Sequence, residues 1–348
     1  MRPIGYYVHH RGRGHLDRAR RIAGHLRRPC TLIGTLSDVD GGDLQVVQLP
    51  DDADGERSSS ARGEDMPHAF HFAPLDFPRV RERMAAVAAW VAREKPALVV
   101  VDVSVEVALF CHLLSVPTVF IRLAGDRSDQ AHLEAFRAAR TIVAPFPSSF
   151  EHAATPAWVR QKTIYAGFLH EAPTDGPAIV TPKSVGVVLG AGGTRLSAGD
   201  MIAAAHATPD RTWHVYGDIS TTGESLPGNL TLHGFVDDID VQIAPIDILI
   251  GEGGDGVVSL AVRHAKRFIC FPQTRPFDEQ LVKARGLQER GAALVRLEWP
   301  APHDWSALLE LASRLDPKAI RQLDSAHSLR TAVAAIEQVA DAYDPHRP

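Results

Sequence analysis

The sequence predicts an α/β protein made of two doubly wound domains with parallel sheets. Two observations carry this prediction. Short runs of branched apolar residues alternate with amphipathic helical segments along most of the 348 residues. Several of these runs end in glycine-containing loops that lead into a helix, a pattern typical of parallel sheets with a ligand site at their carboxyl edge. A chain of this length can also bury two hydrophobic cores.

The bulk composition excludes several classes of protein. Hydrophobic residues make up 45% and charged residues 23%, as in soluble globular proteins, and the net charge of −5 argues against a broad nucleic-acid surface. The three cysteines are scattered in apolar segments, which favours a reducing compartment. No apolar run reaches the roughly 20 residues that span a bilayer, and the first strand is too short for a signal peptide. We therefore expect a cytoplasmic protein without a transmembrane segment or nucleic-acid partner, with peripheral membrane contact left open.

The first domain is expected over residues 1–170. It begins with a strand at 4–8, a glycine-containing loop at 9–15 and a helix whose apolar residues recur at helical spacing, with Arg18 among the charged residues of the opposite face. Further strands are expected at 31–34, 44–49, 97–102, 118–121, 141–144 and 164–167, and helices at 80–94, 106–114 and 130–140.

The pattern restarts after a linker. Residues 171–183 hold three prolines and several small polar residues, which predicts the linker. The second domain is expected over 184–325 and a terminal amphipathic helix over 326–348. Strands are expected at 184–190, 212–216, 230–233, 246–250 and 267–271, with a helix at 198–206.

Two glycine loops of the second domain are candidate anion sites. Each follows a strand and opens a helix, so its backbone N–H groups and the positive helix end converge on one point. Glycine lets a ligand lie against the main chain, where a Cβ would block it. One such loop alone is equally consistent with a tight turn that binds nothing, but two loops favour phosphate or pyrophosphate. The candidate residues are Gly190, Gly192, Gly193, Thr194, Gly253, Gly254, Asp255 and Gly256.

The segment after the second loop resembles a known family. Gly-Gly-x-Gly at 253–256, a helix, a strand, Phe271-Pro272 and then Glu279-Gln280 at the next helix look like the donor half of GT-B glycosyltransferases. The likeness is to the family of the cell-wall lipid-precursor N-acetylglucosaminyltransferase, whose C-terminal domain is of the glycosyltransferase family 28 type. It implies two Rossmann-like domains facing a central cleft, and a C-terminal helix that crosses back to the first domain.

The resemblance also implies roles for individual residues. The glycine loops would hold a nucleoside diphosphate, with a UDP-sugar as the expected donor and no separate cofactor. Glu279 and Gln280 would bind donor-sugar hydroxyls, and Phe235 and Val236 would wall the base. Leu260 departs from the family, because many members carry a ribose-binding Glu at this place, and a leucine side chain accepts no hydrogen bond. An alternative for Asp278–Gln280 is structural, because acidic residues at the start of a helix interact favourably with the helix dipole. The alternative for Phe235 is a buried residue in a turn.

His15 is the candidate general base. Sugar transfer with inversion needs a group that removes the proton of the attacking hydroxyl, and imidazole titrates near neutrality. In the resembling family a His ends the first-domain glycine loop, and His15 matches it. His9 and His10 compete for the role, and capping or anion binding are alternatives. The acceptor-side candidates are Gly12, Arg13, Gly14, Asp102 and Asp126, for which capping and surface ion pairs are the competing interpretations.

Other chemistry lacks its motifs. The chain has 17 histidines, yet no His, Cys or Asp grouping has metal-ligand spacing, so no metal site is expected. Neither a Gly-x-Ser-x-Gly elbow nor a Walker-type Gly-Lys-Ser/Thr is present. We therefore expect a metal-independent, inverting glycosyltransferase acting on a small-molecule, glycan or lipid-linked acceptor. A nucleotide-sugar epimerase on the same scaffold and a non-catalytic binding or regulatory protein are the alternatives, the latter favoured by Leu260.

Overall fold

The computed structural model describes residues 1–9, 13–36, 42–51, 66–170, 179–190, 193–219, 221, 223–325 and 327–344. Gly12 and Gly192, the side chain of Arg13, and residues 171–178 of the predicted linker lie outside the described part. The chain divides into two compact units. Unit 1 comprises residues 1–146, 153–166 and 327–348, and unit 2 comprises residues 147–152 and 167–326.

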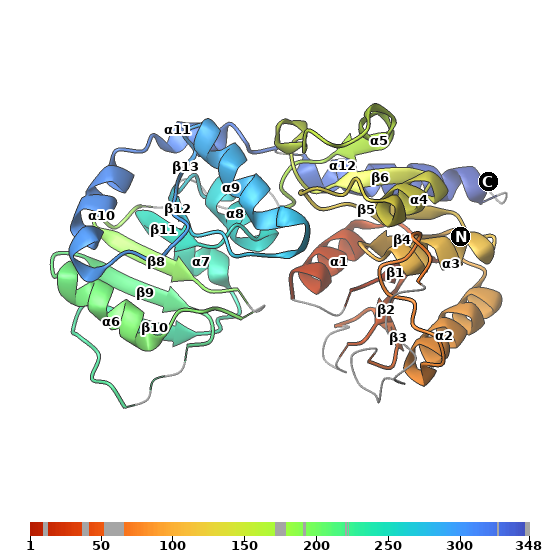
Figure 1. The fold of residues 1–348 in the computed structure, drawn as a ribbon, viewed down its shortest axis with the longest axis horizontal. Helices are drawn as coiled ribbons and strands as arrows, with labels where there is room; N and C mark the ends of the chain where they lie inside the picture. The colour runs from red at the N-terminus through yellow and green to blue at the C-terminus, as the bar shows by residue number, and fades with distance from the viewer. Residues whose placement is uncertain are drawn as a thin grey trace. The chain divides into compact units, whose positions relative to one another are not determined.

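Unit 1 is a seven-stranded sheet with strand order β3-β2-β1-β4-β5-β6-β7, and every strand pair is parallel. Figure 1 shows its helices along the sheet. The elements are β1 (Ile4–Tyr7), α1 (Arg13–His25), β2 (Cys30–Gly34), β3 (Gln45–Gln48), α2 (Pro78–Glu94), β4 (Leu98–Asp102), α3 (Val105–Leu113), β5 (Thr118–Ile121), α4 (Gln130–Ala138), β6 (Thr141–Ala144), α5 (Ala157–Lys162), β7 (Thr163–Tyr165) and α12 (Ser328–Tyr343).

Unit 2 is a six-stranded parallel sheet with order β10-β9-β8-β11-β12-β13. Its elements are the 3₁₀ turn η2 (Ser148–Phe150), β8 (Ser184–Val188), α6 (Ala198–Ala207), β9 (Thr212–Tyr216), β10 (Leu230–Gly234), α7 (Ile239–Ile243), β11 (Ile248–Gly251), α8 (Asp255–Arg263), β12 (Arg267–Cys270), η3 (Pro276–Asp278), α9 (Glu279–Glu289), β13 (Ala293–Val295), η4 (Pro302–Asp304), α10 (Trp305–Ser313) and α11 (Pro317–Arg321).

Each sheet reverses its strand order at one point. In unit 1 the chain winds outward from β1 to β3 on one side and from β4 to β7 on the other, so the reversal lies between β1 and β4. In unit 2 the reversal lies between β8 and β11. Loops diverge at such a switch point, which leaves room for a ligand at the carboxyl edge of the sheet. Both predicted loop systems follow strands at these two points.

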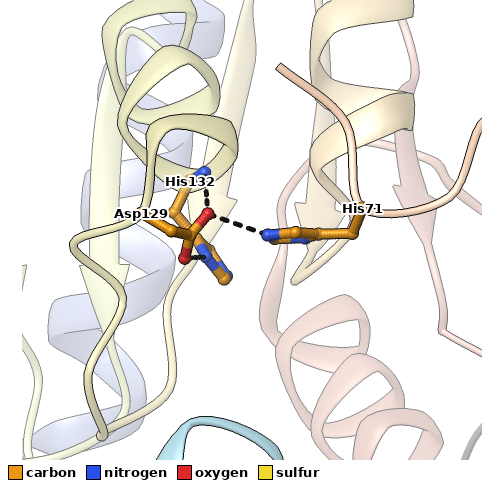
Figure 2. A group of neighbouring side chains, drawn as sticks. All are labelled: His71, Asp129 and His132. Carbon is orange, nitrogen blue, oxygen red and sulfur yellow. Dashed lines mark hydrogen bonds and ion pairs between the residues drawn. The ribbon is translucent and has the colours of Figure 1, made fainter. Parts of the chain in front are cut away.

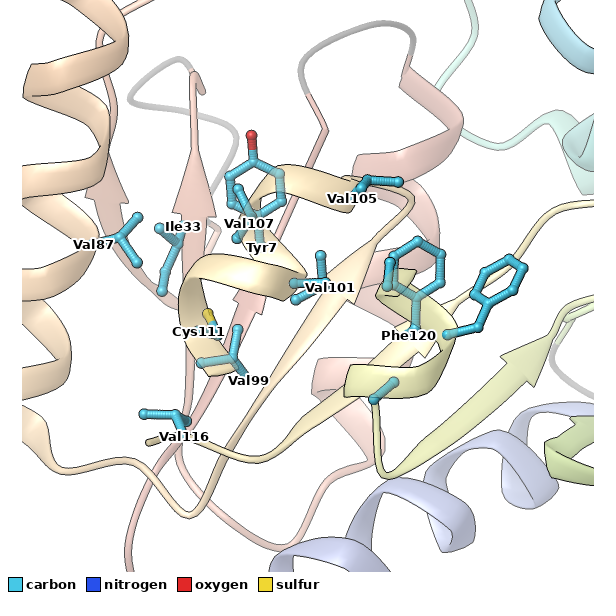
Figure 3. Packing of buried hydrophobic residues seen from close by; sticks show 14 of the residues in the cluster. Tyr7, Ile33, Val87, Val99, Val101, Val105, Val107, Cys111, Val116 and Phe120 are labelled. Atoms are coloured by element: carbon cyan, nitrogen blue, oxygen red, sulfur yellow. The ribbon is translucent and has the colours of Figure 1, made fainter. Parts of the chain in front are cut away.

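The core of unit 1 explains why β4 is so apolar. All of its residues are buried, as expected for a central parallel strand covered on both faces. Val99 and Val101 point to the same face and belong to the cluster that also contains Val107 and Cys111 of α3, and Figure 3 shows this packing. The carboxyl end of β4 is therefore held in a close-packed environment.

Residues at the predicted first boundary belong to unit 2 instead. The sequence places residues 167–170 in the first domain, but their side chains pack elsewhere. The rings of Phe150 and Phe168 meet edge to face with centroids 5.4 Å apart. Gly286 of α9 leaves the room that Phe150 fills, because a Cβ there would lie 2.7 Å from the Phe150 ring. Ser259 Oγ also donates a hydrogen bond of 2.9 Å to the Leu169 carbonyl.

The terminal helix α12 packs on unit 1, as the family resemblance implied. It contacts α1, β4, β6 and β7. Buried Arg28 donates to Asp344 at 2.6 Å and to Asp341 at 2.8 Å, and these bonds fix the end of the helix. Within the described ranges, none of the helices is both long and apolar enough to cross a membrane.

Candidate active site

His15 and Asp102 form a pair at the switch point of unit 1. His15 lies in the first turn of α1, which follows β1, and Asp102 is the last residue of β4. Nδ1 of His15 lies 2.9 Å from Oδ1 of Asp102. The His15 side chain is 15% exposed whereas Asp102 is fully buried, so solvent reaches the imidazole but not the carboxylate. The sequence predicted both residues but not that they touch.

Two further buried side chains hold the carboxylate of Asp102. Arg18 donates from Nε to Oδ2 at 3.0 Å and from Nη2 to Oδ1 at 2.9 Å. Tyr6 donates from its hydroxyl to Oδ2 at 3.3 Å. Burial acts to raise the pKa of Asp102, but the charges of Arg18 and then His15 outweigh it and hold that pKa well below its usual range. Asp102 is therefore ionised at neutral pH.

The prediction that Arg18 lies on the polar face of α1 is wrong. Its side chain is 6% exposed, because it is three residues after His15 and faces the carboxylate of Asp102. Helical periodicity in the sequence cannot reveal this, since the partner comes from another strand. Tyr6 was likewise expected only as a strand residue. Burial and then the neighbouring Asp102 raise its pKa well above the usual value, so the hydroxyl keeps its proton and donates.

The neighbours of His15 decide which ring nitrogen carries hydrogen. Arg18 Nη2 also lies 2.9 Å from Nδ1 of His15, but a guanidinium can only donate. Asp102 can only accept when ionised, and a charge-assisted bond to it is stronger than a bond to a neutral nitrogen. This favours hydrogen on Nδ1 and leaves Nε2 as the basic nitrogen. The pair thus has the arrangement of a base held by an orienting carboxylate.

The remaining acceptor-side candidates are placed differently. Asp126 accepts from the backbone N–H of Ser128 at 3.1 Å and from its hydroxyl at 2.6 Å, so its carboxylate stabilises its own loop. Gly14 is exposed in the first turn of α1, with no atom within 4 Å of an added Cβ. The His9 ring lies 5.4 Å from that of His15, between centroids. His10 lies outside the described residues.

The two glycine loops of unit 2 meet at one edge of their sheet. Val188 at the end of β8 pairs with Gly251 at the end of β11. A Cβ on Gly190 would lie 3.7 Å from the carboxylate of Glu252. A pocket of about 300 Å³ opens here, and its polar and aromatic lining includes Arg195, Asp200, Glu252, Gln273, Glu298 and Trp299. Leu189 and Arg195, on either side of the first loop, and Gly251 and Glu252, at the start of the second, therefore line one pocket within this unit.

The glycines of the second loop serve two different purposes. A Cβ on Gly251 would lie 2.5 Å from Val257, and one on Gly253 would lie 2.8 Å from the Gln280 carbonyl, so both are needed for packing. Gly256 faces open space, and a Cβ on Gly254 would meet only Nε2 of Gln280 at 3.9 Å, an ordinary contact. Gly254 is also the N-cap of α8 and makes no side-chain cap. The N-terminus of α8 can thus receive an anion against bare main chain.

In the first loop, Gly193 has φ +85°, a left-handed conformation that favours glycine. Thr194 accepts the backbone N–H of Leu196 through its hydroxyl at 3.1 Å. This bond stabilises the turn that leads toward α6.

Glu252 was not among the predicted site residues. It is one of two acidic residues of the second glycine loop, and it is 8% exposed. Gln273 donates to its carboxylate, and Gln280 does so at 3.4 Å. Burial raises its pKa, and the bond from Gln280 and the charges of Arg275 and Arg195 only partly oppose this shift. A carboxylate here repels a diphosphate unless it is protonated or moves.

The side chains of Glu279 and Gln280 interact with other groups of the protein. The Gln280 side-chain oxygen accepts the backbone N–H groups of Gly253 at 3.2 Å and of Gln273 at 2.8 Å, so it ties the loop after β12 to the glycine loop. Glu279 pairs with Lys283 at 3.1 Å, and Lys283 also pairs with Asp255. Lys283 is fully buried between these carboxylates. It is therefore not placed to neutralise the phosphates of a donor.

Comparison with known proteins identifies the architecture. No protein-family sequence model and no curated protein sequence matches the chain. Solved structures do match over nearly its whole length. The spinosyn forosaminyltransferase SpnP has a TM-score of 0.68 and 18% identity, covering 98% of this chain and 99% of its own. MurG of Acinetobacter baumannii has a TM-score of 0.66 and 16% identity, covering 97% and 99%. The glycosyltransferase VinC, solved in complex with dTDP, has a TM-score of 0.66 and 16% identity, covering 98% and 100%.

The chain has the GT-B fold. It consists of two parallel sheets of seven and six strands with helices between the strands, and the compared structures match it over nearly the whole chain. The fold predicted from the sequence is confirmed. Within GT-B architecture, His15 belongs to the N-terminal unit and the glycine loops to the C-terminal unit.

Two further details concern the C-terminal unit of this GT-B chain. Phe235 is 61% exposed at the end of β10, so it is not a buried turn residue. Asp238 caps α7 by accepting from the backbone N–H of Val241 at 3.3 Å. Leu260 is 3% exposed and belongs to the buried face of α8, so at this place the chain has a core residue.

Proposed function

We propose that this chain is a glycosyltransferase that moves a sugar from a nucleoside diphosphate to an acceptor hydroxyl, with inversion and without a metal ion at the donor phosphates. The observation that carries the proposal is the contact between His15 and Asp102 at a switch point of a GT-B chain. A partly exposed imidazole backed by a buried, ionised carboxylate is suited to act as a general base.

The transfer would be a single displacement. Nε2 of His15 takes the proton of the acceptor hydroxyl while the acceptor oxygen attacks the anomeric carbon. The bond from that carbon to the diphosphate oxygen breaks, and the electron pair leaves with the diphosphate. Asp102 stabilises the imidazolium that forms, through the bond to Nδ1. Attack from the face opposite the leaving group inverts the anomeric centre.

The leaving diphosphate would bind in unit 2. The uncapped N-terminus of α8 and the open glycines Gly254 and Gly256 provide N–H groups for developing negative charge. Exposed Phe235 is available to stack on a base. VinC was solved with dTDP, and the family resemblance implies a UDP-sugar, so both nucleotides are candidates. We propose a small-molecule, glycan or lipid-linked acceptor and a cytoplasmic location.

Calorimetry with uridine, thymidine and guanosine diphosphates tests the donor half. We expect one of them to bind, and binding of none would remove the basis for sugar transfer. The sugar nucleotides of the diphosphate that binds are then tested for diphosphate release in the presence of acceptor mixtures, with His15→Asn as the comparison.

A second candidate is a protein that binds a nucleotide sugar without transferring it. Two observations favour it: Leu260 is a core residue, and Glu252 places a carboxylate in the glycine loop. This candidate predicts diphosphate binding that is unchanged in His15→Asn, together with diphosphate release that is equally slow in both proteins. The epimerase alternative would be revealed by an epimer formed from the donor alone.

A further inference from the structure

A histidine-rich group lies in unit 1 outside the His15–Asp102 pair. We call it the His71 cluster, and it consists of His71, Asp129 and His132. Figure 2 shows both imidazoles directed at the same carboxylate. Nε2 of His71 lies 2.8 Å from Oδ1 of Asp129, and Nδ1 of His132 lies 2.5 Å from Oδ2. The two rings lie 4.5 Å apart between centroids.

Defined backbone holds each member of the cluster. Asp129 is the N-cap of α4 and accepts the backbone N–H of His132 at 3.1 Å. The loop that carries His71 is fixed by Glu106, whose Oε1 accepts the backbone N–H groups of His71 at 2.8 Å and Phe72 at 2.9 Å. The three side chains thus come from a tied loop, a helix cap and a first helical turn.

We propose that the His71 cluster binds a divalent first-row transition-metal ion such as Zn²⁺. Its potential ligand atoms, two imidazole nitrogens and one carboxylate oxygen, all lie within 4.8 Å of one another. Two histidines and one carboxylate form a ligand set of open zinc sites, which keep a position for water or substrate. The side chains of His71 and Asp129 are 35% and 39% exposed, so an ion can reach them.

The cluster must rearrange to admit the ion. Zinc–ligand bonds of about 2.0–2.1 Å in a tetrahedral site separate the ligand atoms by roughly 3.3 Å. The two contacts to Asp129 are shorter than this, so the carboxylate must move away from both rings, and the two ring nitrogens, which lie within 4.8 Å of each other, must settle at this separation. His71 lies on a loop between residue 66 and α2, and not in a helix or strand.

Arg127 opposes the ion and would tune its affinity. Its Nη1 lies 3.1 Å from Nε2 of His132, and its Nε donates to the Leu123 carbonyl at 3.1 Å. A guanidinium only donates, so it places the hydrogen of His132 on Nδ1, toward Asp129. A neutral His132 that binds an ion through Nδ1 carries its hydrogen on Nε2, facing Arg127. Binding of the ion therefore requires the Arg127 guanidinium to move away from the His132 ring.

The position of the cluster relates it to the edge of the sheet that holds Asp102. The loop of His71 is bonded to Glu106 in the first turn of α3, which follows β4 and Asp102, and Asp129 follows β5, the strand that pairs with β4. If the proposed sugar transfer holds, the open position of the ion would receive an oxygen of the acceptor. Metal binding itself does not depend on that function.

Cobalt titration tests the site. The full chain, dialysed against EDTA, is titrated with Co²⁺ and followed by its visible ligand-field absorption, and Zn²⁺ is then added as competitor. We expect saturable Co²⁺ absorption that Zn²⁺ removes. His71→Ala and Asp129→Asn should each weaken binding at least tenfold, and Asn keeps the oxygen that caps α4. His68→Ala, which changes an exposed histidine of the same loop outside the cluster, should bind like the wild type.

A second variant tests the role of Arg127. Gln at position 127 offers an oxygen to the Nε2 hydrogen of His132, so Arg127→Gln should bind Co²⁺ more tightly, on the order of tenfold. Circular dichroism and thermal melts establish that each variant is folded. The proposal is overturned if the wild type gives no Co²⁺ absorption, or if that absorption persists unchanged in folded His71→Ala and Asp129→Asn. In that outcome the cluster is a hydrogen-bonded chain that stabilises the His71 loop.

Discussion

Nδ1 of His15 lies 2.9 Å from Oδ1 of Asp102, although 87 residues separate them along the chain. β1 and β4 are paired neighbours at the switch point of their sheet, so the loop after β1 and the end of β4 meet. The contact gives the imidazole a buried carboxylate partner, and it leads to the first two predictions.

Replacing His15 by Asn should lower the transfer rate by about 10²–10⁴-fold, which is the usual contribution of a general base. The affinity for the nucleoside diphosphate should not change, because the glycine loops belong to unit 2. Steady-state rates and calorimetry measure the two quantities. His25→Asn, an exposed histidine at the other end of α1, serves as control. Wild-type turnover in folded His15→Asn would show that another group is the base.

Replacing Asp102 by Asn should lower both turnover and stability. The change leaves the buried guanidinium of Arg18 without its counter-ion, which typically costs about 3–5 kcal/mol of unfolding free energy. Denaturant unfolding at several pH values measures this cost. The pKa of Asp102 is lowered in the folded state, so its contribution is present above the unfolded value of about 3.9 and is lost as the pH falls. The stability gap between wild type and variant should therefore narrow in acid, and a constant gap would contradict the ion-pair explanation.

Glu252→Gln should strengthen binding of the nucleoside diphosphate, because it removes a negative charge from the pocket of the glycine loops. In the wild type, affinity should rise as the pH falls toward the raised pKa of Glu252, since a protonated carboxyl no longer repels phosphate. The variant should bind with a flatter pH dependence. Calorimetry across the pH range measures both effects. Weaker binding by folded Glu252→Gln would indicate that the carboxylate contacts the ligand favourably.

Gly256→Ala and Gly253→Ala form a matched pair for the second glycine loop. Gly256 has open space around its missing Cβ and lies inside α8, so Ala there should leave stability unchanged or raise it by up to about 1 kcal/mol. Diphosphate affinity should nevertheless fall if the ligand lies against the main chain at this point.

Ala at position 253 should instead destabilise the protein, because its Cβ would lie 2.8 Å from the Gln280 carbonyl. Thermal melts and calorimetry on both variants separate packing from ligand contact. Undiminished binding by Gly256→Ala would place the ligand elsewhere.

Arg28→Ala should destabilise unit 1 by about 3–5 kcal/mol, because it removes the buried guanidinium that pairs with the buried carboxylate of Asp344. The neighbouring Arg27 is the control: its side chain is 67% exposed and its ion pairs reach the same helix α12, so Arg27→Ala should cost no more than about 1 kcal/mol. Chemical denaturation of both variants gives the comparison. Equal losses would mean that burial does not decide the strength of this anchor.

Local pattern was sufficient for most of the architecture. The strands at 118–121, 141–144 and 212–216 have the predicted bounds, and the long terminal helix was also predicted. Continuous branched runs identify buried parallel strands because both faces are covered. Helix α5, the short helices α10 and α11 and strand β13 were missed, and α10 is held largely by Trp305, whose ring meets that of Trp213 at 5.1 Å. Such packing between distant segments leaves little periodic signal.

The sequence by itself determined that glycine loops, His15 and Asp102 follow strands, because each lies next to an apolar run that can be read directly. Only the tertiary structure decided which of them meet. Strand order placed Asp102 beside His15, turned Arg18 inward and brought His71 to Asp129 and His132. The physical reason is that periodicity records whether a residue faces a core, whereas its partner there depends on which strands pair, and those strands can be far apart in the chain.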